Sequence, residues 1–252
     1  MYTLKKSLGQ HFLKDENIAR KIVSSLQQCS FANLLEIGAG SGALTKYLLT
    51  LPNISFKAVE IDEEKIEFLL STFPELEKMI IHANFLEMPR PFEGKFAVIG
   101  NFPYNISTQI VFKLIEWRSD LECMVGMFQK EVAQRIVTKE GSKKYGVTSV
   151  LTQAFFYAEY LFEVSEHCFQ PPPKVKSAVI RLRPKTQPLP MKSEESFFRL
   201  VKTAFNQRRK TLRNAVQDLF NREVLRQELF GKRAEQLSVE DFAELSFKMN
   251  HQ

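Results

Sequence analysis

Four consecutive residues could hold a planar base that carries an amino group. Asn101, Phe102, Pro103 and Tyr104 follow an apolar run of strand length at residues 95–99, so we expect them where a buried strand ends. The Asn101 side-chain oxygen can accept a hydrogen bond from the amino group, and a backbone carbonyl in the stretch that Pro103 makes rigid can accept a second. Tyr104 offers a face for stacking, worth about 1–3 kcal/mol per base.

These residue types predict chemistry on an exocyclic amine. The lone pair of the adenine amino group is delocalised into the ring, which makes the nitrogen a poor nucleophile. Two acceptors aimed at its hydrogens would localise the lone pair and stabilise the charge that develops on attack. We therefore assign catalytic roles to Asn101, Pro103 and Tyr104. Taken alone, the segment more often means only a strand, a stiff turn and a helix, so other motifs must decide.

A second group of residues has the pattern of a nucleoside-cofactor site. Residues 34–37 predict a short buried strand, and a glycine turn that includes Gly38 and Gly40 follows it. Glycine lets the backbone approach a ligand, and we expect the next helix, extending to about Leu51, to offer free N–H groups. Glu60 ends the second expected strand, where a carboxylate can accept hydrogen bonds from both ribose hydroxyls.

These motifs do not identify the cofactor. Gly38, Gly40 and Ala43 also satisfy the relaxed dinucleotide fingerprint, so a nicotinamide or flavin oxidoreductase is a rival interpretation. Asn84 follows the third expected strand, residues 79–83, and could accept a hydrogen bond from the amino group of the cofactor adenine. A plain turn residue is the alternative interpretation of Asn84.

Strands and helices alternate regularly through most of the chain. This alternation predicts an α/β fold with a Rossmann-like, doubly wound and mostly parallel sheet. The prolines of residues 184–190 indicate a boundary, beyond which the pattern is helical. We therefore predict a domain of residues 1–184, which includes an N-terminal arm, and a small helical domain of residues 185–252.

The formal net charge of +6 favours a polyanionic partner such as RNA. One basic segment, residues 139–146, suits a mobile loop near a phosphate backbone; the other, residues 204–214, is expected to be helical. A solvated charged surface is the alternative interpretation of both. The candidate RNA-binding residues are Lys143, Lys144, Arg208, Arg209, Lys210 and Arg213.

Cysteine and histidine usage points away from metal and disulfide chemistry. Cys29, Cys123 and Cys168 are odd in number and widely spaced, and the 4 histidines are scattered, so we expect neither a disulfide framework nor a metal site. The first residues lead into no apolar segment, and no apolar run approaches membrane-spanning length. We expect a soluble protein in a reducing, cytoplasmic setting, with no membrane partner.

Nine short motifs in a fixed order make the chain resemble a known family. They are Leu-Gly-Gln-His-Phe-Leu (8–13), Glu-Ile-Gly-Ala-Gly-Ser-Gly (36–42), Glu-Ile-Asp (60–62), Asn-Phe-Pro-Tyr-Asn-Ile-Ser-Thr (101–108), Gln-Lys-Glu-Val-Ala (129–133), Gly-Ser-Lys (141–143), Tyr-Gly (145–146), Pro-Pro-Pro-Lys-Val (171–175) and Gln-Arg-Arg-Lys-Thr-Leu-Arg-Asn (207–214). Each motif alone is weak, but together they are highly specific. From Lys6 to about Asn214 the chain resembles the bacterial 16S ribosomal RNA dimethyladenosine transferases, within the wider rRNA adenine N6-methyltransferase family.

The resemblance implies a seven-stranded methyltransferase domain, a small helical C-terminal domain and S-adenosylmethionine as the methyl donor. The implied substrate is a pair of adjacent adenosines in a hairpin near the 3′ end of 16S rRNA, within the small ribosomal subunit or its precursor. Each adenosine would receive two methyl groups at N6, and we expect the enzyme to act as a monomer in ribosome biogenesis. The implied cofactor contacts are His11, Leu13, Gly38, Gly40, Glu60, Asn84 and Asn101.

Four positions depart from the pattern of the family. His11 stands where the family usually has Asn, Ala39 where it has Pro, and Asn84 where it has Asp. Asn84 keeps one acceptor but lacks the charge, so we expect weaker cofactor binding. Phe102 replaces the commoner Leu and could reshape the pocket. Two alternatives therefore stay open: a low-activity RNA-binding ribosome-assembly factor, and a 23S rRNA adenine N6-methyltransferase of the antibiotic-resistance type.

Overall fold

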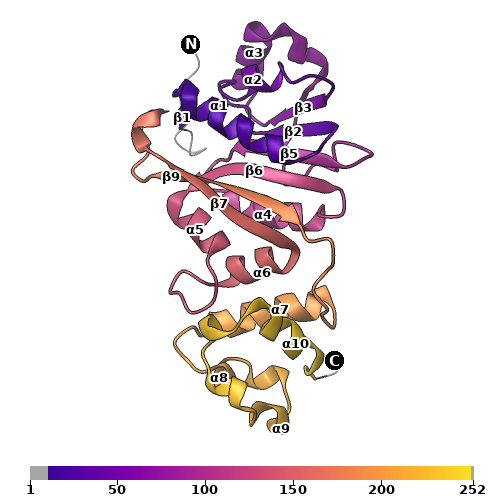
Figure 1. Ribbon diagram of the computed structural model, residues 1–252, viewed down its shortest axis with the longest axis vertical. Coiled ribbons are helices and arrows are strands. Elements are labelled where there is room, and N and C mark those ends of the chain that lie inside the picture. Colours follow the sequence, from indigo (N-terminus) through magenta and orange to yellow (C-terminus); the bar gives the residue numbers. More distant parts are fainter. Residues whose placement is uncertain (1–10, 251–252) are drawn as a thin grey trace. The chain divides into compact units, whose positions relative to one another are not determined.

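The expected strands form one seven-stranded sheet in the computed structural model, which describes residues 11–250 (Figure 1). The strand order is β4-β3-β2-β5-β6-β9-β7. Five strands run parallel to their neighbours: β2 (Asn33–Ile37), β3 (Ser55–Glu60), β4 (Ile80–His82), β5 (Phe96–Asn101) and β6 (Leu121–Gln129). β9 (Ser177–Pro184) is antiparallel to β6, and β7 (Phe156–Val164) is the edge strand beyond it. The predicted α/β sheet is confirmed.

α1 (Glu16–Ser24) precedes the first parallel strand, β2. Helices then connect successive parallel strands: α2 (Thr45–Leu48), α3 (Glu63–Thr72) and α4 (Ser107–Glu116). α1 begins at Glu16 because the Asp15 carboxylate accepts hydrogen bonds from the backbone N–H of Asn17 at 2.9 Å and of Ile18 at 3.1 Å. α2 is much shorter than the predicted helix to Leu51, and the chain turns at Asn53, whose φ is +57°. The expected helix behind the glycine turn is therefore present, but it ends earlier than predicted.

A buried core fixes the central strands. Four successive residues of β5, from Phe96 to Ile99, are each 0% exposed, as a strand covered on both faces requires. This explains why the strand appears in the sequence as a continuous apolar run. The polar residues that matter for the site follow at its end, where this burial stops.

A two-stranded sheet was not predicted. β1 (Phe12–Leu13) pairs antiparallel with β8 (Phe169–Gln170), so Phe12 faces Gln170 and Leu13 faces Phe169. Strands of two residues are too short to show a periodic pattern, and the sequence indicated only a polar arm and a proline-rich connection. The pairing holds the arm against the segment before the triple proline. Residues 8–10 of the first motif lie outside the described residues.

The chain divides into two compact units. Unit 1 comprises Met1–Ala133 and Ala158–Pro184, and unit 2 comprises Gln134–Tyr157 and Lys185–Gln252. The change at Pro184 coincides with the predicted boundary, but residues 134–157 belong to unit 2 and not to the first domain as predicted. The reason is that the apolar face of α6 (Val147–Phe155) packs against α7 (Glu194–Asn206) and α10 (Val239–Phe247). α5 (Lys130–Val137) crosses from one unit to the other. Two short helices, α8 (Leu212–Ala215) and α9 (Arg222–Leu225), complete the α-helices of unit 2.

Three further features concern the setting of the protein. A disulfide joins Cys29 and Cys123, with Cα atoms 6.3 Å apart, which the spacing of the cysteines did not predict because 94 residues separate them. Among residues 11–250 no cluster of His, Cys, Asp and Glu could hold a metal ion. Over the same residues no helix has the length and apolarity needed to cross a membrane.

Candidate active site

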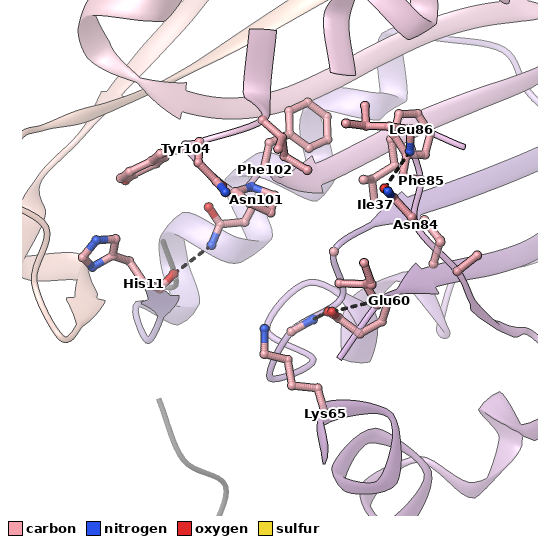
Figure 2. A pocket seen from close by; sticks show the side chains of 18 of the residues that line it. His11, Ile37, Glu60, Lys65, Asn84, Phe85, Leu86, Asn101, Phe102 and Tyr104 are labelled. Carbon is pink, nitrogen blue, oxygen red and sulfur yellow. Dashed lines mark hydrogen bonds between the residues drawn. The ribbon is translucent and has the colours of Figure 1, made fainter. Parts of the chain in front are cut away.

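The site lies where the strand order reverses. From β2 the chain proceeds to β3 and β4 on one side, and β5 then pairs with the other edge of β2 and leads to β6. In open α/β sheets ligands bind at the carboxyl ends of the strands at this point. Gly38 follows β2, Asn101 ends β5 and Glu60 ends β3, and all three line one pocket (Figure 2). The structure thus brings together residues from three of the predicted motifs.

The glycine turn is built from left-handed backbone conformations. Gly38, Gly40 and Gly42 have φ values of +71°, +58° and +79°, which other residues rarely adopt. Gly42 is also needed for space, because a Cβ there would lie 2.5 Å from Cε2 of Phe73. The turn is fixed at its middle, where the Gly40 N–H donates to Glu60 Oε2 at 3.0 Å.

Glu60 already serves three backbone donors. Besides the bond from Gly40, its Oε1 accepts from the backbone N–H of Ile61 at 2.9 Å and of Asp62 at 3.1 Å, and the residue is only 5% exposed. A carboxylate offers about four acceptor positions. One acceptor position of Glu60 therefore remains for a ribose hydroxyl. A second ribose hydroxyl would have to share an acceptor position with one of the three backbone N–H groups.

Asn101 has a fixed side-chain orientation. Its Nδ2 donates to the backbone carbonyl of His11 at 3.1 Å. Because a carbonyl oxygen can only accept, the amide nitrogen must face His11 and Oδ1 must face the other way. Figure 2 shows Oδ1 on the side of Tyr104. An acceptor is therefore preoriented where the sequence predicted one.

Tyr104 is half-buried beside the ring of His11. The ring centroids are 5.5 Å apart and the planes are tilted by 31°. The tyrosine hydroxyl lies 2.6 Å from Ser177 Oγ, within hydrogen-bonding distance. Burial raises the pKa of Tyr104, an effect that the hydrogen bond with Ser177 partly opposes. The imidazole of His11 also bonds through Nδ1 to the Pro171 carbonyl at 2.9 Å, which ties the arm to the triple proline.

The Pro103 carbonyl is partly engaged, because it accepts from the Ile106 N–H at 3.2 Å. A carbonyl oxygen has two lone pairs, so a second hydrogen bond from an adenine amine remains feasible.

Phe102 turns its ring into the sheet. It is 1% exposed and packs edge-on against Phe128, with ring centroids 5.1 Å apart. Two glycines make the space: a Cβ at Gly126 would lie 2.3 Å from Phe102 Cε2, and one at Gly100 would lie 2.6 Å from Cε1. The exchange of Leu for Phe is thus accommodated by the glycines of β5 and β6, although Phe102 still contributes to the lining of the pocket.

Two predicted cofactor contacts are placed differently from the rest. Asn84 lines the pocket, but both ends of its amide are used locally: Nδ2 donates to Glu87 Oε1 at 2.8 Å, and Oδ1 accepts from the Leu86 N–H at 3.1 Å. This is the turn role that the sequence left open, and one lone pair of Oδ1 remains. The Leu13 side chain lies in the hydrophobic core and is not among the residues that line the pocket.

Sequence reasoning did not single out several residues that line the pocket. Phe12 and Lys65 are two of them, with the ammonium of Lys65 5.5 Å from the centroid of the Phe12 ring. Ile61, 52% exposed at the end of β3, adds an apolar surface. Its position directly after Glu60 was an available signal. Phe12 belongs to the motif of residues 8–13, which was also an available signal, whereas Lys65 carried none, because a lysine on a helix usually extends into solvent.

Glu36 is a buried acid beneath the glycine turn. Desolvation raises its pKa to about 8, the nearby charge of Glu60 adds to this, and the hydrogen bond that Thr45 Oγ1 donates to Oε2 at 2.7 Å acts in the opposite direction. Glu36 is therefore mostly protonated at neutral pH. Its hydrogen bond with Thr45 links β2 to α2, and Glu36 is not among the residues that line the pocket.

The candidate RNA-binding residues all lie in unit 2 and are exposed. The expected helix is wrong for three of them: Arg208, Arg209 and Lys210 lie in a turn between α7 and α8, while Arg213 lies on α8. The helix ends at Asn206 because the chain reverses there, with Lys210 N–H donating to the Gln207 carbonyl at 2.8 Å.

Half of these cations already have structural partners. Arg208 binds Glu235 at 2.8 Å and the Lys143 carbonyl, and Arg213 Nε donates to the Leu225 carbonyl at 2.8 Å. Lys144 bonds to the side chain of Gln134. The side chains of Lys143, Arg209 and Lys210 form no hydrogen bond or ion pair with any residue in the described part of the chain. Those three remain available for phosphates.

Comparisons with known proteins agree with the geometry. Residues 1–250 match the family described as ribosomal RNA adenine dimethylase. Two relatives are named ribosomal RNA small subunit methyltransferase A. The one from Cytophaga hutchinsonii is 51% identical over 96% of this chain and 95% of its own length, and the one from Flavobacterium johnsoniae is 52% identical over 97% of this chain and 95% of its own length.

Among solved structures, a dimethyladenosine transferase from Plasmodium falciparum matches with a TM-score of 0.76 and 24% identity, covering 95% of this chain and 99% of that one. The 23S rRNA methyltransferase ErmE matches with a TM-score of 0.73 and 24% identity, covering 95% and 100%. These two structural matches support the fold.

Proposed function

Since this chain belongs to the ribosomal RNA adenine dimethylase family, we propose that it dimethylates two adjacent adenosines of 16S rRNA at N6. The adenosines lie in a hairpin near the 3′ end of this RNA, and the substrate is the small ribosomal subunit or its precursor. The close identity to small subunit methyltransferases over nearly the whole chain supports this substrate over 23S rRNA. The site of action is the cytoplasm, where the small subunit is assembled.

S-adenosylmethionine, the methyl donor of this family, supplies a methyl group activated by a sulfonium. The pocket fits such a ligand: a purine can lie against the exposed Ile61, Glu60 has one free acceptor position for a ribose hydroxyl, and the positive-φ glycines bring the backbone to the cavity. We assign cofactor binding to His11, Gly38, Gly40, Glu60, Asn84 and Asn101, which line the pocket, and to Leu13 through its backbone only, because its side chain lies in the core. Because the Asn84 amide is engaged in its own turn, it contributes less affinity than a free carboxylate would.

The preoriented amide of Asn101 is the observation that carries the catalytic assignment. Its Oδ1 and the second lone pair of the Pro103 carbonyl accept the two hydrogens of the adenine amine. The adenine leaves its stack, which costs a few kcal/mol, and stacking on Tyr104 offsets that cost. Neither acceptor takes up a proton at neutral pH, so the displaced proton leaves to solvent after transfer.

Unit 2 supplies the attraction for RNA. It contains 17 basic and 10 acidic residues and so carries a formal charge of +7, whereas unit 1 contains 18 basic and 19 acidic residues and carries −1. The whole net positive charge of the protein is therefore in unit 2. We assign phosphate contacts to Lys143, Lys144, Arg208, Arg209, Lys210 and Arg213.

Methyl transfer to isolated subunits tests the proposal. Small and large ribosomal subunits from a strain that lacks these methyl groups are incubated in parallel with the protein and labelled S-adenosylmethionine, and the modified bases are mapped. Label confined to adjacent adenosines of the small subunit supports the proposed function. Label on large subunits moves the chain to the resistance-type enzymes, and tight subunit binding without label makes it an assembly factor.

A further inference from the structure

Ser177, which lies outside the pocket, contacts the side chain of the proposed stacking residue, Tyr104. Its Oγ lies 2.6 Å from the Tyr104 hydroxyl, and Ser177 itself is 0% exposed. Ser177 begins β9 and pairs with Gln129, the last residue of β6. Tyr104 lies just beyond the end of β5, the other neighbour of β6. The hydrogen bond therefore links the loop after β5 to β9, which lies two strands away from β5 in the sheet.

The bond is placed to hold the Tyr104 ring in position. At one end the ring is attached to the loop, whose backbone is held by the bond from the Phe102 N–H to the Met127 carbonyl at 3.3 Å and by the Ser107 hydroxyl, which donates to the Tyr104 carbonyl at 3.1 Å. At the other end only the hydroxyl can anchor it. Because the hydroxyl oxygen lies on the axis that runs from Cβ through the ring, anchoring it fixes the direction of that axis, and the neighbouring ring of His11 restricts rotation about it. Either hydroxyl can donate in this bond.

We propose that Ser177 is a positioning residue for methyl transfer, which holds the Tyr104 ring in its stacking position, and that the second transfer to each adenosine depends on it more than the first. The proposal rests on the stacking role assigned to Tyr104 above. An unmethylated amine has two hydrogens for the two acceptors, Asn101 Oδ1 and the Pro103 carbonyl. After one methylation a single N–H remains, so one acceptor is no longer used. Stacking of the adenine on Tyr104 then contributes more to the orientation of N6.

The experiment measures the two products separately. Ser177→Ala, Ser177→Thr, Tyr104→Phe and the double variant Tyr104→Phe/Ser177→Ala are each incubated with unmethylated small subunits and labelled S-adenosylmethionine. N6-methyladenosine and N6,N6-dimethyladenosine are separated after digestion. Cofactor affinity and thermal stability are measured on the same preparations.

For Ser177→Ala we expect the second transfer to slow by about threefold to tenfold, the effect of one neutral hydrogen bond, with a smaller loss in the first. Monomethyladenosine then accumulates while cofactor affinity is unchanged. Ser177→Thr keeps the hydroxyl and restores dimethylation. Tyr104→Phe removes the same bond without altering β9, so it gives the same product ratio, and the double variant is no worse than either single variant.

Three results would overturn the proposal. They are a wild-type ratio of the two products in both Ser177→Ala and Tyr104→Phe, losses that multiply in the double variant, and failure of Ser177→Thr to restore dimethylation. Failure of the proposed function would look different, because the wild-type protein would then leave small subunits unlabelled, or Tyr104→Ala would retain full activity.

Discussion

The two compact units use their polar residues in opposite ways. Around the pocket of unit 1, Glu60 and Asn101 are held by backbone groups: Glu60 accepts from three N–H groups, and Asn101 donates to a carbonyl. In unit 2, the side chains of Arg209 and Lys210 are exposed and bind none of the residues that the structure describes. The formal charges of the units, −1 and +7, follow the same division.

This difference separates two tasks. Groups that act on reacting atoms need fixed directions, which rigid strand ends provide. Groups that attract a phosphate backbone act through charge at a distance and need no fixed direction. Changes in unit 1 should therefore affect the rate of transfer, and changes in unit 2 should affect the salt dependence of RNA binding.

The largest effect is expected at Asn101. Asn101→Ala removes a preoriented acceptor, and loss of one such group in a water-excluded site costs about 100- to 1000-fold in rate. Methyl transfer to small subunits should fall by at least this factor while cofactor binding, measured by calorimetry, stays mostly intact. Near-normal turnover would show that the amide of Asn101 does not activate the amine.

A packing change within the sheet should disturb the position of Asn101. Gly126→Ala places a Cβ where the Phe102 ring lies, and overpacking of this kind costs about 1–3 kcal/mol of stability. We expect a lower free energy of unfolding and a displaced Asn101, hence slower transfer. Phe102→Leu in the same chain should relieve the clash and restore both. If the double variant is as impaired as Gly126→Ala alone, the two residues are not coupled as described.

The buried acid of unit 1 predicts a pH dependence of stability. The pKa of Glu36 rises from 4.5 to about 8 on folding, so the folded protein binds the proton more tightly than the unfolded chain. This contribution is fully present below the unfolded pKa and is lost as the pH rises through about 8, with a slope of about 1.4 kcal/mol per pH unit inside that window. Urea unfolding at several pH values should show this slope in the wild type and a flatter one in Glu36→Gln. Equal slopes would exclude Glu36 as the source.

The smallest effect is expected for the free cations of unit 2. Replacing Arg209 and Lys210 by Ala should weaken small-subunit binding and lower the log–log salt slope by about 0.7–0.9 for each phosphate that is no longer neutralised. Cofactor affinity and unfolding should not change. Lys95→Ala, an exposed lysine of unit 1, is the matched control and should leave the slope unaltered. A similar loss in the control would mean that net charge alone decides binding.

Much of unit 1 could be predicted from the sequence. The strands β2, β3 and β5 were predicted from the sequence, and the residues at their carboxyl ends, Gly38, Glu60 and Asn101, line one pocket. Each of these features depends on local pattern or on the general rule for ligand sites in open sheets.

What could not be predicted depends on contacts between distant segments. The two-residue strands β1 and β8 exist only because they pair with each other across more than 150 residues of chain, and Ser177 gains significance only from its contact with Tyr104. The disulfide between Cys29 and Cys123 is of the same kind. In unit 2, the turn at Arg208 interrupts a segment of good helix formers because the chain must reverse toward α8.

The bond that holds Asn101 has a consequence for how this enzyme can evolve. The acceptor is the main-chain carbonyl of residue 11, an atom that every amino acid possesses. Drift in the side chain at this position, such as the His found here, therefore leaves the amide oriented. Insertions or deletions next to residue 11, which directly precedes β1, would shift the carbonyl itself. Natural variation near residue 11 should accordingly consist of substitutions, with the length of the segment held constant.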